Sequence, residues 1–272
     1  MFKLNEKNGI KYFTSTKLEG LHHAFTTRGL DMRSEDERNF LLKNLNFCKV
    51  KVDSEQKNLP EDYFDVNKTE ASDEHKEVSK ICDVAIPQQE HTANIAIINN
   101  EWEAKKDFLA TDGVIITVPN IPVMLCFADC VPVMIYSKKD NVLAVLHAGW
   151  RGTAAGIVKK ACKILTQEME INPQNLTMAI GACISKEYFE VSDEIKNALE
   201  YSLDGDYEDI FSENKADLKK INAYQATETG IMAIDVMEYC TCGDNELFYS
   251  YRKENQTPKR HGIIAQLKED LG

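Results

Sequence analysis

The chain has 272 residues, 43% of them apolar, which is enough to bury a sizeable core. Forty-four acidic against 32 basic residues give a net charge of -12, and this field repels phosphate backbones, so nucleic acid is excluded as the main partner. No run reaches the roughly 18 apolar residues of a membrane span, and residues 1–9 lack an apolar signal core. We therefore expect a cytoplasmic protein with no membrane partner.

The first part of the chain after the N-terminal segment is polar. Residues 35–87 carry charge runs and few apolar anchors, and we expect solvated helices and loops there. From residue 95 the pattern changes to β-branched or continuously apolar runs, which are typical of strands buried on both faces. These runs predict a central sheet between residues 95 and 184. A turn-forming segment at 137–141 predicts a hairpin or a tight connection that brings Cys130 near His147.

Helical patterns follow the strands. Apolar residues at helical spacing predict an amphipathic helix over 153–168, and Asn172-Pro173 ends it. The run 176–184 returns to a strand, a Ser or Asp cap opens a second helix at 192–201, and a further helix is predicted over 220–239. We expect one domain over residues 1–272 of the α/β (α+β) class, with central mixed β-sheets flanked by helices in a layered α/β/β/α sandwich.

The eight cysteines do not form a disulfide or zinc-finger framework. The chain is long enough to fold without staples, so we expect mostly reduced thiols. Cys126 and Cys130 have no second pair of the CxxC kind, and Cys240-Thr241-Cys242 stands alone. Any metal site must therefore be assembled from distant segments.

His147 ends an apolar run and opens the motif His-Ala-Gly-Trp-Arg-Gly at 147–152. A lone histidine at a strand end is usually satisfied by a backbone hydrogen bond. Here, however, Arg151 lies between two glycines at an expected helix start, where the backbone can approach a ligand and the guanidinium can grip an anion. The combination favours a functional site.

Asp129 and Cys130 interrupt another apolar run. Asp129 is the one polar residue on its face if the strand is continuous, so either the strand breaks here or a carboxylate is buried. An unpaired buried charge is costly, and the pair is therefore a site candidate. Cys130 alone could equally be a small core residue.

His91 lies where a loop meets the strand at 95–98, which by itself is weak evidence. One thiolate and two imidazoles at three strand ends would nevertheless form a three-ligand site from His91, Cys130 and His147. Zinc with an open fourth position is the metal that such a set most resembles. A water bound there ionises near neutral pH, which is typical of catalytic sites.

These motifs resemble those of the laccase-domain proteins, also called YfiH-like or multicopper polyphenol oxidase-like, which are regarded as purine nucleoside phosphorylases. The ADC and HAGWRG blocks, in this order, are the most specific part of the resemblance. The sequence departs from the family directly after Gly29. Thr92, which follows His91, stands where the family has a glycine. The matching segments are GIKYF (9–13), HAFTTRG (23–29), QEH (89–91), TDG (111–113), ADCVPV (128–133), HAGWRG (147–152), AIGACI (179–184), FEV (189–191), CT (240–241) and FYSYR (248–252).

The resemblance implies that His91, Cys130 and His147 bind the metal, usually zinc, with copper as the less favoured ion. It implies purine nucleosides and inorganic phosphate as partners, with phosphorolysis of adenosine, inosine, guanosine and S-methyl-5'-thioadenosine. It also implies hydrolytic deamination of adenosine to inosine. We expect a monomer or a small homo-oligomer.

Four arginines are candidate substrate contacts under this resemblance. Arg28, in the segment FTTR, matches part of the family's pocket. The candidate phosphate contacts are Arg151, Arg252 and Arg260.

For deamination, we hypothesise that a metal-bound water attacks C6 of adenine while an acid protonates the leaving amine, and Asp129 is the nearest carboxylate in sequence to a ligand. Three alternatives stay open. A copper oxidase would need more imidazoles than the six present. A structural zinc would take a fourth ligand from Cys126, Asp129 or Cys183. A metal-free pair would use Cys130 as nucleophile and His147 as base.

Overall fold

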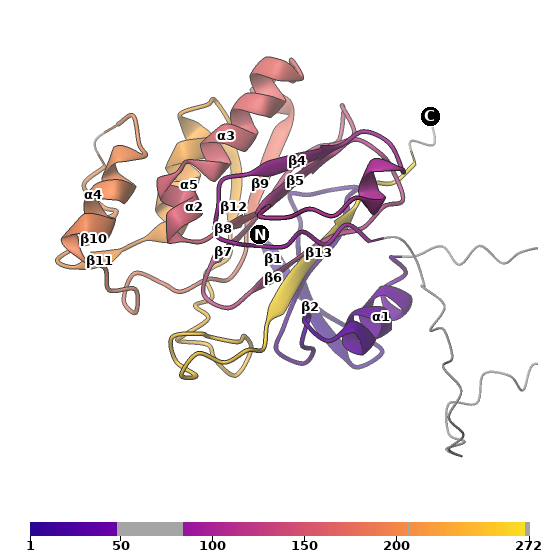
Figure 1. Cartoon of the computed structure of the whole chain (residues 1–272), viewed down its shortest axis with the longest axis horizontal. Helices are drawn as coiled ribbons and strands as arrows, with labels where there is room; N and C mark the ends of the chain where they lie inside the picture. Colours follow the sequence, from indigo (N-terminus) through magenta and orange to yellow (C-terminus); the bar gives the residue numbers. More distant parts are fainter. Residues whose placement is uncertain (48–83, 206, 270–272) are drawn as a thin grey trace, which may run out of the picture.

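A computed structural model describes residues 1–47, 84–205 and 207–269. Most of the polar stretch at 35–87, and with it Cys48, His75 and Cys82, therefore lies outside the described residues. Two β-sheets packed face to face form the centre of the protein (Figure 1). The first is antiparallel, with strand order β1-β2-β3-β13-β6, and its strands are β1 (Phe2–Lys7), β2 (Ile10–Ser15), β3 (His22–Thr26), β13 (His261–Gln266) and β6 (Val123–Phe127).

The second sheet is mixed, with strand order β12-β9-β7-β8-β5-β4. Its central strands β9, β7, β8 and β5 are antiparallel to one another, whereas β12 and β4 run parallel to their neighbours at the two edges. Its strands are β4 (Ile95–Ile98), β5 (Gly113–Ile116), β7 (Val131–Ser137), β8 (Val142–Ala148), β9 (Leu176–Ile180) and β12 (Ala233–Val236).

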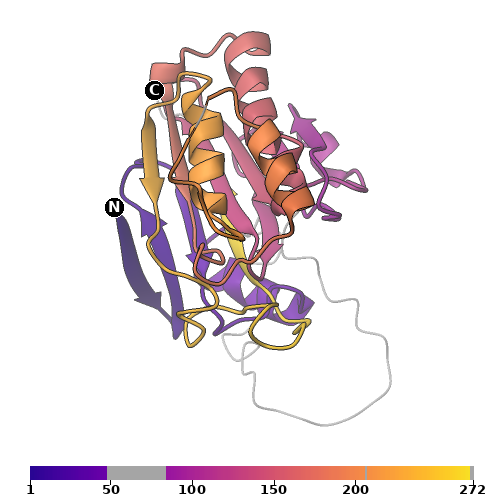
Figure 2. The ribbon, with the colours of Figure 1, turned by 90° about the vertical axis from the view of Figure 1, so that its left-hand side faces the viewer.

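Helices cover the outer faces of both sheets. Figure 2 shows the group α2 to α5 on one side of the molecule and the N-terminal strands on the other. The helices are α1 (Glu35–Asn44), α2 (Trp150–Ala154), α3 (Ile157–Lys163), α4 (Asp193–Tyr201) and α5 (Leu218–Thr227). Smaller elements are the hairpin β10 (Phe211–Ser212) and β11 (Lys215–Ala216), the 3₁₀ turns Glu103–Lys105 and Pro173–Asn175, and the π-helical turn Ile164–Glu168.

Three apolar clusters hold the layers together. Alternation along β7 sends Val133 and Ile135 towards α3 and sends Met134 to the opposite side, where it meets the five-stranded sheet. The outer face of that sheet is covered by Leu41 and Leu42 of α1. The order of layers is helix, sheet, sheet, helix, which confirms the predicted α+β class with mixed sheets flanked by helices.

The predicted central sheet exists, but one of the strands assigned to it belongs to the other sheet. Residues 95–184 were expected to form one sheet, but β6 leaves it and pairs with β13, about 140 residues later in the chain, in the other sheet. The strands at 2–26 and 261–266 were not predicted. Their faces are only partly apolar in sequence, because the outer face of β1 and β2 is exposed.

Two helix predictions need correction. The helix expected over 153–168 is split, because Gly156 adopts a left-handed φ of +71° between α2 and α3. The helix expected over 220–239 ends at Thr227, since Gly230 has a φ of +92° and β12 follows. The helix at 192–201 is confirmed, and the Oγ of Ser192 accepts a hydrogen bond from the Ile195 N–H as its cap.

No helix within the described residues is long and apolar enough to span a bilayer. All six cysteines that the structure describes are free thiols, as expected.

His261 predicts a loss of stability in acid. Its side chain is 2% exposed, neither ring nitrogen has a hydrogen-bond partner, and burial together with the charge of Arg260 lowers its pKa to about 3. An unfolded histidine titrates near pH 6.5, so the unfolded state binds this proton first as the pH falls. The neutral His261 side chain makes its full contribution to the free energy of unfolding above about pH 6.5. This free energy decreases as the pH falls towards 3, by roughly 2–3 kcal/mol at pH 4.5. Urea unfolding of His261→Leu at pH 7.5 and 4.5 should show a smaller difference than wild type, and an unchanged difference would refute this assignment.

Candidate metal centre

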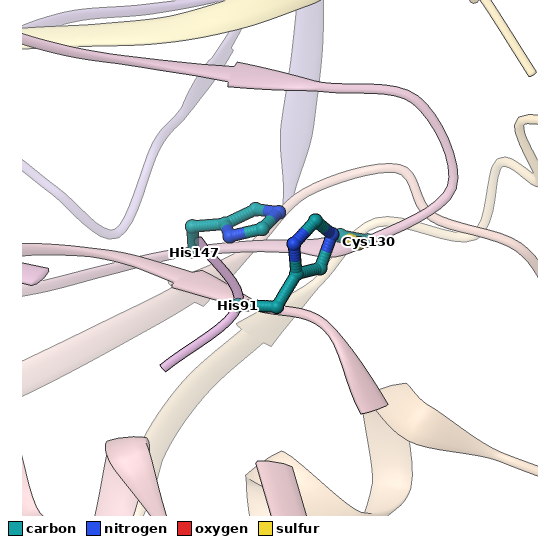
Figure 3. A group of neighbouring side chains, drawn as sticks. All are labelled: His91, Cys130 and His147. Atoms are coloured by element: carbon teal, nitrogen blue, oxygen red, sulfur yellow. The ribbon is translucent and has the colours of Figure 1, made fainter. Parts of the chain in front are cut away.

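Three side chains from distant segments meet at one end of the strands of the six-stranded sheet (Figure 3). His91 lies in the loop before β4, Cys130 directly precedes β7, and His147 is in β8. One ligand atom from each residue lies within 4.8 Å of the other two. His91 is exposed, Cys130 is half-buried and His147 is buried, so the cluster faces solvent from one side. The structure thus brings together the three residues that the sequence predicted as ligands.

The hairpin of β7 and β8 places two of the three ligands. Its register pairs Pro132 with His147, and so Cys130 lies just beyond the end of the paired strands next to the imidazole. The strand that the sequence left open as continuous or broken is broken: β6 ends at Phe127, and β7 begins at Val131 after a bend. Asp129 in this bend has a left-handed φ of +82°.

Asp112 holds both histidines, and its role was missed in the sequence. Its Oδ1 accepts hydrogen bonds from the His147 Nδ1–H at 2.7 Å and from the His91 backbone N–H at 3.0 Å. Its Oδ2 accepts from the backbone N–H groups of Glu90 and Thr92 and from the Thr92 hydroxyl. The side chain is fully buried. The available signal was a carboxylate directly before a buried strand, in the motif Thr111-Asp112-Gly113.

The hydrogen bond to Asp112 fixes the tautomer of His147. Burial raises the pKa of Asp112, but the hydrogen bonds from His147 and Thr92 outweigh it and lower the pKa to about 2. The carboxylate is therefore ionised and can only accept, so Nδ1 of His147 carries the proton. Nε2 is therefore the nitrogen that would bind a metal ion, after losing the proton that it shares with Cys130, as in other carboxylate–histidine–metal arrangements.

Cys130 is an unusually acidic thiol. Burial raises its pKa, but the charge of His147 and hydrogen bonds from His147 and His91 lower it to about 6. Burial lowers the pKa of His147, but the charge of Cys130 and the hydrogen bonds to Asp112 and Cys130 outweigh it and raise the pKa to about 9. A thiolate is the form of cysteine that binds metals, and a soft sulfur with two imidazoles suits zinc or copper. The donor set therefore fits a transition-metal ion.

None of the candidate fourth ligands completes the cluster. The Sγ of Cys126 donates to the Met32 carbonyl, and the Sγ of Cys183 donates to the Ile184 carbonyl. Burial raises the pKa of Cys126 to about 11 and raises that of Cys183 further. Cys183 is a core thiol, and Cys126 is a half-buried thiol that packs against the core. Within residues 1–47, 84–205 and 207–269, the only cluster of three or more possible metal ligands is that of His91, Cys130 and His147.

Two glycines of the motif 147–152 let the His91 loop approach the sheet. A Cβ atom on Gly149 would lie 2.8 Å from Cδ2 of His91 and 3.0 Å from Sγ of Cys130. A Cβ atom on Gly152 would lie 2.8 Å from the carbonyl oxygen of Thr92. These distances are shorter than van der Waals contact, so the motif needs glycine at both positions to bring the loop to the cluster.

Replacing Gly149 by alanine should weaken metal binding. The added methyl group must displace His91 or Cys130, and we expect the zinc affinity to fall about 10-fold or more. Competition with a chromophoric chelator measures this change. Gly29→Ala is the matched control, because a Cβ there meets only the Thr27 hydroxyl, at 3.8 Å. Equal affinities for Gly149→Ala and wild type would contradict the close approach.

The four candidate arginines differ in how they relate to the cluster. Arg151 lies two residues after Gly149, and its guanidinium stacks on Trp150 with 4.2 Å to the ring centroid. Arg252 donates its backbone N–H to Asp129 and its Nη1 to the Tyr188 carbonyl. Arg151 thus belongs to the segment that packs against the His91 loop, and Arg252 belongs to a segment that contacts Asp129, next to Cys130.

Arg260 and Arg28 have other surroundings. Burial and the charge of Arg33 lower the pKa of Arg260, and the charge of Cys130 counteracts part of this effect. Its Nη1 donates to the carbonyl groups of Thr257 and Lys259. Arg28 is paired with Glu254 at 3.3 Å and also donates to the Asn245 carbonyl. Its positive charge is thus balanced within the protein.

The fold and the cluster together define an α+β protein with a three-ligand candidate metal centre. The family described as multi-copper polyphenol oxidoreductase laccase matches residues 18–267, and the chain belongs to this family. This confirms the resemblance drawn from the motifs.

Relatives and solved structures agree with this assignment. A purine nucleoside phosphorylase of Staphylococcus epidermidis is 35% identical over 193 residues, 66% of this chain and 72% of the relative. One of Clostridium acetobutylicum is 30% identical over 201 residues, 72% and 84% of the two chains. YlmD from Geobacillus stearothermophilus has a TM-score of 0.80 at 21% identity, covering 97% and 98% of the two chains. YfiH from Bacillus licheniformis has a TM-score of 0.77 at 20% identity, covering 98% and 99%. The two structures show that the fold is shared.

Proposed function

We propose that this protein is a zinc-dependent purine nucleoside phosphorylase. The observation that carries the proposal is the cluster of His91, Cys130 and His147, which has three donors and an open side. Structural zinc sites usually have four protein ligands, whereas catalytic ones keep a position for water or substrate. The relatives from Staphylococcus epidermidis and Clostridium acetobutylicum, of which the match covers 72% and 84%, are named purine nucleoside phosphorylases.

The proposed substrates are adenosine, inosine, guanosine and S-methyl-5'-thioadenosine, with inorganic phosphate. Phosphate bonds to C1' of the ribose as the bond from C1' to the purine nitrogen breaks, giving the base and ribose 1-phosphate or its methylthio analogue. A zinc ion bound at the cluster supplies positive charge and a water that ionises near neutral pH. Hydrolytic deamination of adenosine, in which water replaces the C6 amine, is part of the same proposal and needs no phosphate.

The residues of the chain have separate tasks in this proposal. Asp112 keeps the proton on Nδ1 of His147 and fixes the His91 loop, so both imidazoles are oriented before substrate binds. Arg151, Arg252 and Arg260 are the candidate phosphate contacts, since guanidinium groups bind phosphate oxygens through two parallel hydrogen bonds. Arg28 is a weaker candidate, because Glu254 already neutralises it.

A copper-dependent polyphenol oxidase is the second candidate, and the family's description favours it. One cysteine and two histidines are also a copper donor set. A multicopper oxidase needs a trinuclear cluster as well, and its imidazoles are missing from the described residues. His22 stacks on Phe47, His23 accepts the Ser15 N–H, and His261 is enclosed by aromatic rings.

Incubating the zinc-loaded protein with adenosine, with and without phosphate, tests the proposal. Chromatography should resolve phosphate-dependent adenine from phosphate-independent inosine. Adenine that forms only with phosphate supports the phosphorylase, and inosine without phosphate supports the deaminase. Unchanged adenosine under both conditions refutes both activities, and oxygen uptake with a phenol together with a blue absorption band would establish the oxidase.

A further inference from the structure

Asp129 has an unfavourable backbone conformation next to a metal ligand. Its φ of +82° is in the left-handed region, which residues with a side chain seldom adopt. Such conformations persist only when the surrounding contacts enforce them. The residue precedes Cys130 directly, so any change in its backbone moves the thiolate.

Three segments converge on Asp129 and enforce this conformation. Its Oδ1 accepts a hydrogen bond from the Thr241 hydroxyl at 2.6 Å, and its Oδ2 accepts from the Arg252 backbone N–H at 2.7 Å. Its carbonyl oxygen accepts from the Ile184 N–H at 3.0 Å. Thr241 is fully buried, and its own N–H donates to the Cys183 carbonyl. Both carboxylate oxygens and the carbonyl are thus used by the protein.

We propose that Asp129 is a positioning residue that holds Cys130 next to the two histidines. The carboxylate holds the bend between β6 and β7 against its backbone strain by tying it to the segments at Thr241 and Arg252. The Cys130 thiolate is thereby held close to His147 of the β7–β8 hairpin and to His91 of the preceding loop. The inference rests on the proposed metal site.

The Asp129 carboxylate also links the bend that carries Cys130 to Arg252, which is a candidate phosphate contact. The backbone N–H of Arg252 bonds to Asp129, and its guanidinium lies against Tyr188 and Phe189. Loss of the carboxylate should therefore loosen both Cys130 and the segment that presents Arg252. We expect weaker zinc binding together with a higher KM for phosphate, whereas kcat at saturating zinc and phosphate is largely retained.

Asp129→Asn, Asp129→Gly and Thr241→Val test the proposal, with Thr241→Ser as the matched control. Asparagine and glycine both tolerate the left-handed backbone, so these two variants change the carboxylate without adding strain. Valine removes only the hydroxyl that donates to Oδ1, and serine retains it. Chelator competition reports zinc affinity without any need for activity, and phosphorolysis of inosine reports KM for phosphate and kcat.

We expect at least 10-fold weaker zinc binding in Asp129→Asn and Asp129→Gly, a smaller loss in Thr241→Val, and wild-type affinity in Thr241→Ser. Wild-type zinc affinity in Asp129→Asn and Thr241→Val would overturn the proposal. If that affinity comes with a kcat for adenosine deamination that is lost at every zinc concentration, Asp129 instead acts as the acid hypothesised from the sequence for that reaction. A protein without phosphorylase activity would still show the loss of zinc affinity, so the two proposals fail separately.

Discussion

Cys130→Ala should remove zinc and abolish turnover. The cluster has three protein donors, and without the thiolate the two imidazoles retain a metal only weakly. A bound metal ion contributes several kcal/mol to transition-state stabilisation, so we expect kcat/KM for inosine phosphorolysis to fall at least about 1,000-fold. Metal analysis of the purified variant and steady-state kinetics measure the two effects. If one metal serves both reactions, adenosine deamination is lost in parallel.

Cys126→Ala is the control for this experiment. Cys126 lies four residues earlier, its Sγ donates to the Met32 carbonyl, and burial raises its pKa to about 11. Its removal should leave the zinc content and both activities unchanged. Full turnover in Cys130→Ala would exclude a metal at the cluster as the source of activity. Alkylation of wild-type Cys130 by iodoacetamide separates the remaining alternative, because zinc should protect a ligand thiolate and would not protect a metal-free nucleophile.

Asp112→Asn should reduce zinc affinity by about 10- to 100-fold without removing a ligand. Asparagine has one acceptor where the wild-type carboxylate accepts five hydrogen bonds, and its amide group would face backbone N–H donors. The Nδ1 proton of His147 would lose its charged partner, and the loop that carries His91 would lose its anchor. Breaking this buried network should also lower the free energy of unfolding of the metal-free protein by roughly 3 kcal/mol.

Asp140→Asn is a suitable comparison, because Asp140 is an exposed carboxylate in the β7–β8 turn that bonds to the Ser137 hydroxyl. Both proteins are compared by chelator competition and by urea unfolding after metal removal. Unchanged zinc affinity in Asp112→Asn would show that the histidines are oriented by other contacts. A loss of the same size in Asp140→Asn would show that the effect is not local.

The three ligands could be predicted from the sequence because each interrupts an apolar run or directly flanks one. His147 ends the strand β8, Cys130 precedes β7, and the turn between these strands fixes their register. Asp112 could not be assigned in this way. Its function depends on a loop 20 residues earlier that wraps around it, and neither its type nor its spacing predicts five donors.

The architecture was predictable where the pattern is local. The buried strands β5, β7, β8 and β9 have continuous apolar runs, and they pair as one sheet. The pairing of β6 with β13 is a contact across about 140 residues, and no local pattern specifies it. Helix lengths were overestimated where Gly156 and Gly230 adopt positive φ, because each continues an otherwise helical spacing.

Removal and return of zinc tests the central claim most directly. The purified protein is stripped with a chelator, and phosphate-dependent release of adenine from adenosine is followed as zinc is added back. We predict that stripping removes the activity and that one zinc per chain restores it in full. A stripped protein that still cleaves adenosine at the original rate, with no metal bound, would contradict a metal centre at His91, Cys130 and His147.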